Sequence, residues 1–155
     1  MIPVKQVMNP NVITFREDTP VEEAARILTE KRITGAPVVG PDGEVVGIVS
    51  EIDVVTKRGE RVGEIMSPNV ISVTEDTGIV EAAQLLAGER IRRLPVLQRG
   101  RLVGLLSRSD VLGFFTYSHW ACQDCGHSER GLEPPASCRH CGGARFELER
   151  TQPGT

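Results

Sequence analysis

Apolar residues recur at helical spacing in two separate stretches of the chain. The spacing predicts two amphipathic helices, each with one apolar stripe and small residues that permit close packing. The apolar positions of the first stretch are Val21, Ala24, Ala25 and Leu28, and those of the second are Ile79, Ala82, Ala83 and Leu86.

Residues just before the first stripe mark where its helix begins. Thr19 is followed by Pro20, and Glu22 stands three residues after the threonine. Proline is favoured at the first helical position, and Thr-x-x-Glu is the pattern of a capping box. We therefore expect a helix that begins directly after Thr19.

Short β-branched and apolar runs surround this helix. Residues 12–15 predict a strand before it, and residues 37–39 and 45–49 predict a hairpin around Pro41-Asp42-Gly43. A second helix is expected to start near Ser50. The predicted order is strand, helix, strand, strand, helix.

The whole pattern occurs twice. Residues 8–55 align with residues 66–112, with Met8 over Met66 and Asp53 over Asp110, and a single deletion lies in the hairpin turn. A period this long, present only twice, indicates a duplicated unit whose copies bury each other. We expect an α/β (α+β) fold with two repeats packed about a pseudo-twofold axis.

Composition narrows the class of protein. The 155 residues are 39% apolar, which is ordinary for a globular chain, and the net charge of −3 comes from acidic and basic residues that are mixed along it. This balance argues against a nucleic-acid or membrane surface. The first residues do not resemble a signal peptide, and no window approaches the roughly 20 apolar residues of a membrane span. We expect a cytoplasmic protein.

The stretch "GIVSEID" at residues 47–53 returns as "GLLSRSD" at residues 104–110. Ser-x-x-Asp at a helix start predicts a capping box, worth about 1 kcal/mol. A carboxylate can also accept hydrogen bonds from both hydroxyls of a cis-diol, and a serine at a helix start provides an anion site. Both roles can coexist.

Together, "GAPV" or "RLPV" before the hairpin and Gly-apolar-apolar-Ser-x-x-Asp after it resemble a tandem pair of CBS domains, a Bateman module, over residues 1–115. In that family, the cleft between the repeats binds an adenosine-containing ligand such as AMP, ATP or S-adenosylmethionine. The pair regulates an attached or partner protein and usually forms homodimers through its helices.

The resemblance implies a set of ligand-binding residues, with the aspartates on ribose hydroxyls, the serines near phosphate and the other positions lining the base. The first copy supplies Ile13, Thr14, Ala36, Pro37, Ser50 and Asp53, which we call the first half-site. The second copy supplies Ile71, Ser72, Leu94, Pro95, Ser107 and Asp110, which with the two arginines described next form the second half-site.

The two copies differ in charge. Where the first has Gly35 and Glu51, the second has Arg93 and Arg108. Guanidinium groups bind phosphate oxygens in a bidentate manner. Our hypothesis is that these arginines give the second half-site a preference for phosphate.

After residue 115 the pattern changes to two closely spaced cysteine pairs separated by 12 residues. Two Cys-x2-Cys pairs can supply four thiolates to one metal ion, and the glycine after each pair permits a tight turn that directs N–H groups at the sulfurs. The predicted metal ligands are Cys122, Cys125, Cys138 and Cys141.

This segment resembles a zinc ribbon or rubredoxin-like module, and Glu133-Pro134-Pro135 before the third cysteine is similar to the rubredoxin domain of rubrerythrins. Arg139 stands where that family usually has proline, so we favour zinc, with iron as the alternative. Since four cysteines complete the shell, the histidines at positions 119, 127 and 140 are expected to be exposed to solvent.

No catalytic constellation is visible. The repeats contain no histidine for an acyl-transfer triad, and a closed thiolate shell leaves no open metal position, so we expect no enzyme activity. We expect CBS repeats at 1–58 and 59–116 and a metal module at 117–155. Together they would form an adenine-nucleotide sensor that acts on an unidentified partner protein. The alternatives are a nucleotide-gated electron-transfer protein with iron and a structural adaptor with a zinc-stabilised docking tail.

Overall fold

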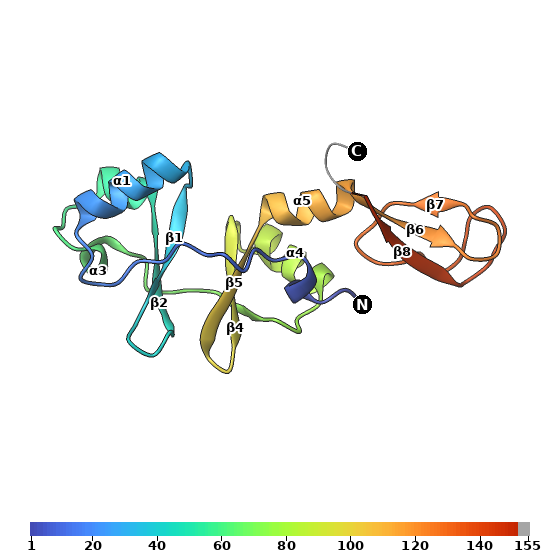
Figure 1. Cartoon of the computed structure of the whole chain (residues 1–155), viewed down its shortest axis with the longest axis horizontal. Coiled ribbons are helices and arrows are strands. Elements are labelled where there is room, and N and C mark those ends of the chain that lie inside the picture. Colours follow the sequence, from blue (N-terminus) through green and yellow to red (C-terminus); the bar gives the residue numbers. More distant parts are fainter. Residues whose placement is uncertain (152–155) are drawn as a thin grey trace. The chain divides into compact units, whose positions relative to one another are not determined.

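The computed structural model describes residues 1–151 and combines short helices with small sheets (Figure 1), which confirms the mixed α/β class. By their contacts, the residues fall into two compact units. One contains Met1–Met8, Asp76–Arg93 and the described residues from Leu106 onward, and the other contains Asn9–Glu75 and Leu94–Leu105. No helix within residues 1–151 is long and apolar enough to cross a membrane.

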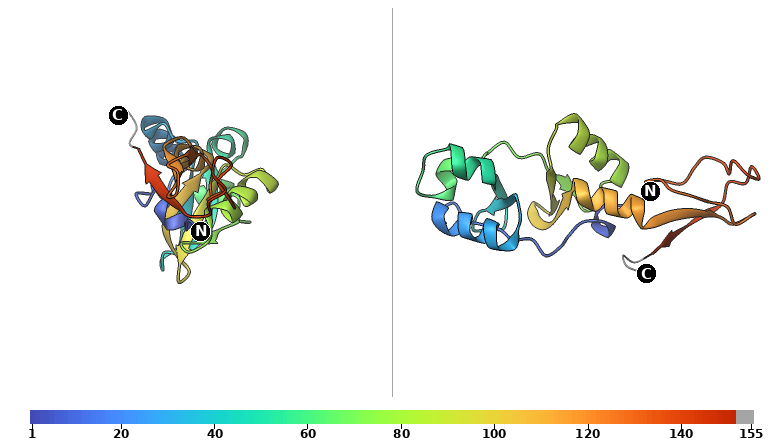
Figure 2. Two further views of the ribbon diagram at one scale, coloured as in Figure 1. Left: turned by 90° about the vertical axis from the view of Figure 1, so that its right-hand side faces the viewer. Right: turned by 90° about the horizontal axis from the view of Figure 1, so that it is seen from above.

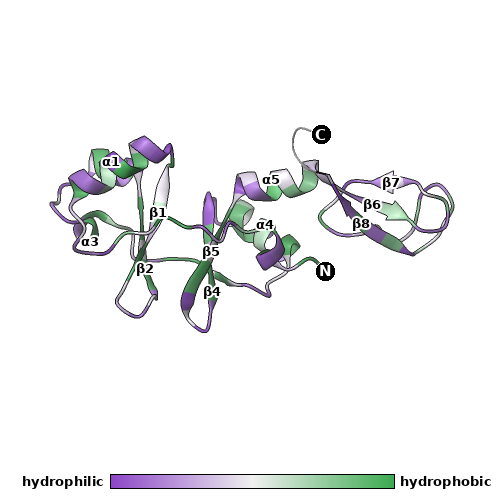
Figure 3. Ribbon diagram, viewed as in Figure 1, coloured by the Kyte–Doolittle hydropathy of each residue, from purple (hydrophilic) through white to green (hydrophobic). Residues whose placement is uncertain are grey.

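The first repeat is built on an antiparallel hairpin. Its strands are β1 (Gly35–Val39) and β2 (Val45–Ser50), and its helices are α1 (Val21–Lys31) and α2 (Glu51–Thr56). Helix α3 (Val62–Ile65), which leads into the second repeat, packs against the same core. Green and purple alternate along α1 in Figure 3, as expected for an amphipathic helix. The apolar side chains enclosed by these elements form the core, which includes Phe15, Leu28, Val38, Val49 and Ile65.

The start of α1 differs from the prediction. The helix begins at Val21 after Pro20, and no side chain caps it, so the predicted capping box is wrong. The Thr19 hydroxyl instead accepts a hydrogen bond from the Arg16 N–H at 3.0 Å. The Val21 N–H donates to the carbonyl of Glu60 at 2.9 Å, so backbone from a distant segment satisfies a donor at the helix start.

The strand predicted before α1 is almost absent. Of residues 12–15, Phe15 alone forms a bridge, parallel to Val38. The corresponding strand of the second repeat, β3 (Val73–Thr74), is short as well. It pairs in parallel with β4 (Arg93–Gln98), and β5 (Arg101–Ser107) completes the sheet.

The segment that precedes each repeat packs against the helix of the other repeat. The N-terminal 3-10 turn (Val4–Gln6) lies beside α4 (Ile79–Gly88), where the Ile79 N–H donates to the Ile2 carbonyl at 2.8 Å (Figure 2). In the same way, the Val62 N–H of α3 donates to the carbonyl of Thr19 just before α1, at 2.9 Å. The chain therefore exchanges equivalent segments between its two repeats.

The cysteine segment forms a small sheet of its own directly after α5 (Arg108–Thr116). Strand β6 (Ser118–Cys122) lies between β7 (Ser128–Glu129) and β8 (Phe146–Arg150). Trp120 of β6 is buried, and its indole N–H donates to the Gly131 carbonyl at 3.1 Å. This tryptophan thereby ties the central strand to the loop that leads to the second cysteine pair.

Candidate functional site

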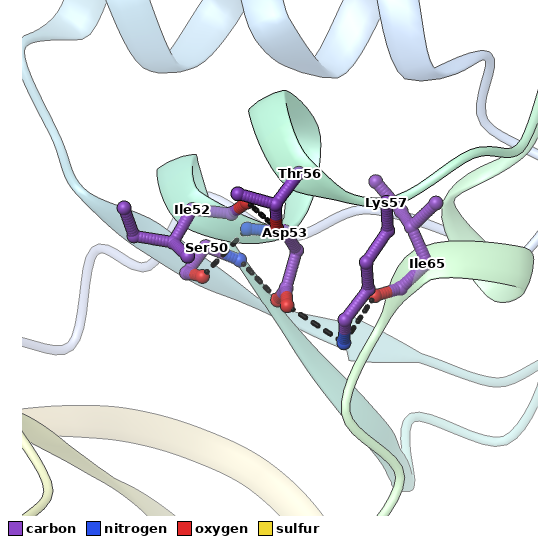
Figure 4. Close-up of polar contacts among 6 residues, drawn as sticks. All are labelled: Ser50, Ile52, Asp53, Thr56, Lys57 and Ile65. Atoms are coloured by element: carbon purple, nitrogen blue, oxygen red, sulfur yellow. Dashed lines mark hydrogen bonds and ion pairs between the residues drawn. The ribbon is translucent and has the colours of Figure 1, made fainter.

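Both Ser-x-x-Asp motifs form the predicted capping boxes. At α2, the Ser50 hydroxyl accepts from the Asp53 N–H at 3.2 Å, and Asp53 Oδ2 accepts from the Ser50 N–H at 2.9 Å (Figure 4). At α5, the equivalent distances for Ser107 and Asp110 are 3.1 and 2.9 Å. Each aspartate therefore uses one carboxylate oxygen in the cap of its own helix. What else the aspartate can bind depends on the surroundings of the other oxygen.

Backbone pairing brings the residues of the first half-site to neighbouring strand ends. Ser50 pairs with Gly35 across the hairpin, and the Phe15 N–H donates to the Pro37 carbonyl at 3.0 Å, which places Thr14 beside the β1 strand. Ala36 and Pro37 are buried and Ile13 is half-buried, whereas Thr14 is exposed. The predicted neighbours of this half-site do lie together.

The base-lining residues of the second half-site are arranged in the same way. Val73 pairs with Val96, so Ser72 lies next to Pro95 at the ends of β3 and β4. Leu94 and Pro95 are buried, whereas Ser72 is exposed. The duplication has therefore kept the strand pairing as well as the motif.

The second oxygen of Asp53 is occupied. Lys57 Nζ lies 2.8 Å from Asp53 Oδ1 and also donates to the carbonyl of Ile65 at 3.2 Å (Figure 4). Burial raises the pKa of the Asp53 carboxyl, but the hydrogen bonds from Lys57 and Ser50 outweigh this effect and hold the pKa below its usual value. The sequence analysis missed this contact, although an Asp and a Lys four residues apart are a visible signal.

Asp110 has a different surrounding. The residue four positions later is Phe114, a buried apolar side chain. Within the part of the chain that the structure describes, the Asp110 carboxylate accepts only from Ser107, and the carboxyl is more accessible than that of Asp53. The second copy therefore presents a carboxylate oxygen without a partner.

The two arginines of the second half-site lie near the start of α5 and on β4. Arg108 is exposed, and its Nε donates to the carbonyl of Ile91 at 2.8 Å. Arg93 is half-buried in β4. The bond to Ile91 fixes the Arg108 side chain through one nitrogen, and the other two guanidinium nitrogens have no partner among the described residues.

The four cysteine sulfurs lie within 4.8 Å of one another. Cys122 Sγ is 3.6 Å from Cys141 Sγ, and Cys125 Sγ is 3.7 Å from Cys138 Sγ. A tetrahedral site with metal–sulfur bonds of about 2.3 Å has edges of roughly 3.8 Å, so the sulfur positions fit a single metal ion. Among residues 1–151, these cysteines are the only group of this kind.

Backbone N–H groups point at these sulfurs. The His140 N–H donates to Cys138 Sγ and the Gly143 N–H to Cys141 Sγ, each at 3.4 Å. Gly126 and Gly142 have φ of 80° and 79°, as expected for the turn after each cysteine pair. Such N–H groups stabilise thiolate charge.

The pKa values of Cys122 and Cys141 are shifted in opposite directions. Hydrogen bonding from the Cys125 backbone lowers the pKa of Cys122 to about 7, against the effect of burial. At Cys141, the Gly143 N–H lowers the pKa, but the adjacent thiols and burial raise it to about 12. Four thiolates this close repel one another, so a bound cation is needed to hold all of them deprotonated at neutral pH.

The histidines near the cysteines make other contacts. The rings of His127 and His140 stack with centroids 5.6 Å apart, and His119 Nε2 lies 2.9 Å from Glu149 Oε2. His140 is exposed, whereas His119 and His127 are half-buried, so the prediction of exposed histidines is wrong for these two. Arg139, at the position that departs from the rubredoxin pattern, pairs with Glu129 of β7 at 2.6 Å.

Comparison with known proteins decides the family. The family model described as "CBS domain" matches residues 4–60 and 62–117. The chain belongs to the CBS domain family. Residues 118–155, which include the cysteines, lie outside the matched ranges.

Relatives and solved structures agree with this assignment. The chain is 30% identical over 125 residues to protein MJ1225 of Methanocaldococcus jannaschii, with 77% of this chain and 44% of the relative covered. It is 36% identical over 104 residues to inosine-5'-monophosphate dehydrogenase of Thermoplasma acidophilum, which covers 66% of this chain and 21% of the enzyme. The chain thus spans less than half the length of these two curated relatives.

Two solved CBS pairs are similar in structure. The structure of CBSX2, an Arabidopsis thaliana protein, in complex with AMP has a TM-score of 0.69 at 32% identity, covering 72% of this chain and 94% of that one. The CBS pair of MJ0100 in complex with 5'-methylthioadenosine and S-adenosyl-L-methionine also has a TM-score of 0.69, at 28% identity, covering 75% and 97%.

Proposed function

We propose that this chain is a regulatory module whose CBS pair binds an adenosine-containing ligand of the AMP, ADP or ATP type. The AMP complex of CBSX2, at 32% identity, carries the proposal, and the complex of MJ0100 supports it. In this chain, the Ser-x-x-Asp junctions supply the groups that a ribose diol and a phosphate require.

The roles of the residues follow from their chemistry. The unpartnered oxygen of Asp110 accepts from the ribose hydroxyls, and Ser107 together with Arg108 contacts phosphate. The backbone of Ser72 and Pro95, at strand ends, offers hydrogen bonds to the base. Ligand binding changes the contacts of a partner protein only if the bound and free arrangements differ in affinity for it.

Isothermal titration with AMP, ATP, S-adenosylmethionine and adenosine tests this function. Asp110→Asn keeps an acceptor for the Ser107 N–H but loses the charge, and we expect at least about tenfold weaker binding. Asp42→Asn, in the exposed hairpin turn, is the matched control and should bind as the parent does. If no adenosine compound binds the parent, or Asp110→Asn binds equally well, the proposal is wrong.

We further propose that the cysteine module holds zinc and contacts the partner protein. The sulfur separations of 3.6 and 3.7 Å support a tetrahedral metal, and iron is the alternative. The exposure of Cys125 and Cys141 favours a second function, electron transfer, because it leaves one edge of the centre open to a redox partner. Native mass spectrometry and the visible spectrum separate the metals, since ferric thiolate is red and zinc thiolate is colourless.

Association of two chains through the helices is part of this proposal. Val55 of α2 and Leu112 of α5 occupy equivalent positions in the two repeats and are 75% and 64% exposed. Large apolar side chains exposed at matching places are typical of a symmetric interface. Val55→Glu with Leu112→Glu should convert a dimer to a monomer in size-exclusion chromatography with light scattering. A parent that is monomeric at all concentrations contradicts this.

A further inference from the structure

Both oxygens of the Asp53 carboxylate already have a partner within the chain, and the residue is buried. Oδ2 accepts from the Ser50 N–H at 2.9 Å, and Oδ1 lies 2.8 Å from the Lys57 ammonium (Figure 4). Only 7% of the residue's surface is exposed. A diol that approaches this carboxylate meets an ammonium group at the oxygen it needs.

The ammonium is held from two sides. Besides Asp53 on α2, Lys57 Nζ contacts the carbonyl of Ile65, the last residue of α3, at 3.2 Å. Two acceptors on different elements restrict where the ammonium can go, although 45% of the lysine side chain is exposed. A ligand has to break both contacts, and breaking a hydrogen bond to a charged group lowers affinity by about tenfold or more.

The second copy offers a comparison within the same molecule. Asp110 makes the same capping box, but Phe114 stands where the first copy has Lys57. No basic group contacts the Asp110 carboxylate among the described residues. The helix cap is the same in both copies, so the lysine is the difference that lies directly at the carboxylate.

We infer that Lys57 closes the first half-site, so that the chain binds one adenosine-containing ligand, at the second half-site. The inference rests on the proposed function and assigns Lys57 as a positioning residue that determines which half-site is open. A purely structural brace between α2 and α3 would affect stability and leave the number of bound ligands unchanged.

Isothermal titration with AMP and with adenosine tests the inference on the full chain. The parent should bind one ligand per chain. Lys57→Gln should bind two, because Asp53 then no longer carries the ammonium group on Oδ1. Arg58→Gln removes an equal charge from the next residue, which is exposed, and should bind one. Lys57→Arg keeps a cation and should also bind one. Thermal unfolding of each variant shows that it is folded.

Double variants assign the sites. Lys57→Gln with Asp53→Asn should return to one ligand, and Lys57→Gln with Asp110→Asn should keep only the newly opened site. The inference is wrong if the parent binds two ligands, or if Lys57→Gln binds one with unchanged affinity. Either result leaves the proposed function, binding of an adenosine-containing ligand, intact. If the parent binds none and Lys57→Gln binds one, the lysine is confirmed and the assignment of Asp110 fails. If neither binds, both proposals fail.

Discussion

The two aspartates at equivalent helix starts show how far a residue's role depends on its neighbours. Asp53 and Asp110 occupy the same motif and make the same cap, yet only Asp53 is paired with a lysine. The pattern predicted both caps, because Ser-x-x-Asp acts within one turn of backbone. The burial of Asp53 and the hydrogen bond from Lys57 to Ile65 depend on how α3 packs against α2. Local residue spacing does not encode that packing.

The depressed pKa of Asp53 predicts a pH-dependent contribution to stability. A carboxyl whose folded pKa lies below the unfolded value of about 3.9 stabilises the fold above that pH and loses its effect as pH falls through the folded pKa. Asp53→Asn should therefore lower the free energy of unfolding by about 1 kcal/mol near neutral pH. The difference should shrink below about pH 4, as measured by urea denaturation. A difference independent of pH contradicts the assignment.

The Arg108 guanidinium predicts discrimination between ligands. Arg108→Ala should weaken AMP binding by about tenfold and leave adenosine binding nearly unchanged, because only AMP has a phosphate for the guanidinium to contact. Arg101→Ala removes an exposed arginine at the start of β5 and serves as the control. Equal losses for AMP and adenosine would show that Arg108 acts on the fold and not on phosphate.

At the scale of elements, the sequence predicted the presence of the hairpin and the helices better than it predicted how they begin and end. The β1–β2 hairpin and the start of α2 after Ser50 agree with the pattern, because turn residues and caps act locally. The predicted cap at Thr19 is wrong, and the N–H of Val21, the first helical residue, donates to the carbonyl of Glu60, a residue far away in the sequence. The exchange of segments between repeats was likewise invisible in the local pattern.

Replacing glycine by alanine should have opposite effects at two positions, Gly142 and Gly113. Gly142 follows the second cysteine pair at φ 79° with nothing near its Cβ position, so Gly142→Ala introduces only backbone strain, about 1 kcal/mol. If the cysteines hold a metal ion, this should weaken its binding in a chelator competition. Gly113 lies within α5, also without near neighbours, and Gly113→Ala should raise thermal stability by about 0.5–1 kcal/mol. A loss of stability at Gly113 would mean that α5 is covered in solution.

At the scale of the whole molecule, the cysteine segment after α5 has few apolar side chains to support it. Trp120 is the one tryptophan of the chain, and its indole is buried against the loop to Gly131. If metal supplies the folding energy of this sheet, a strong chelator should shift the tryptophan emission to longer wavelength. The helical circular dichroism of the CBS repeats should remain. Emission that does not respond to chelation contradicts a folding role for the metal.

The junction between α5 and the cysteine segment is short and is held by contacts from the far end of that segment. Helix α5 ends at Thr116 and β6 begins at Ser118, and the Thr151 N–H fastens the far end of the module to the intervening Tyr117 carbonyl at 2.8 Å. Arg150 also lies over the ring of Phe114, 5.5 Å from its centroid. These contacts tie both ends of the cysteine segment to the C-terminal end of α5. A tilt of α5 would therefore displace the four sulfurs as well, as long as the contacts hold.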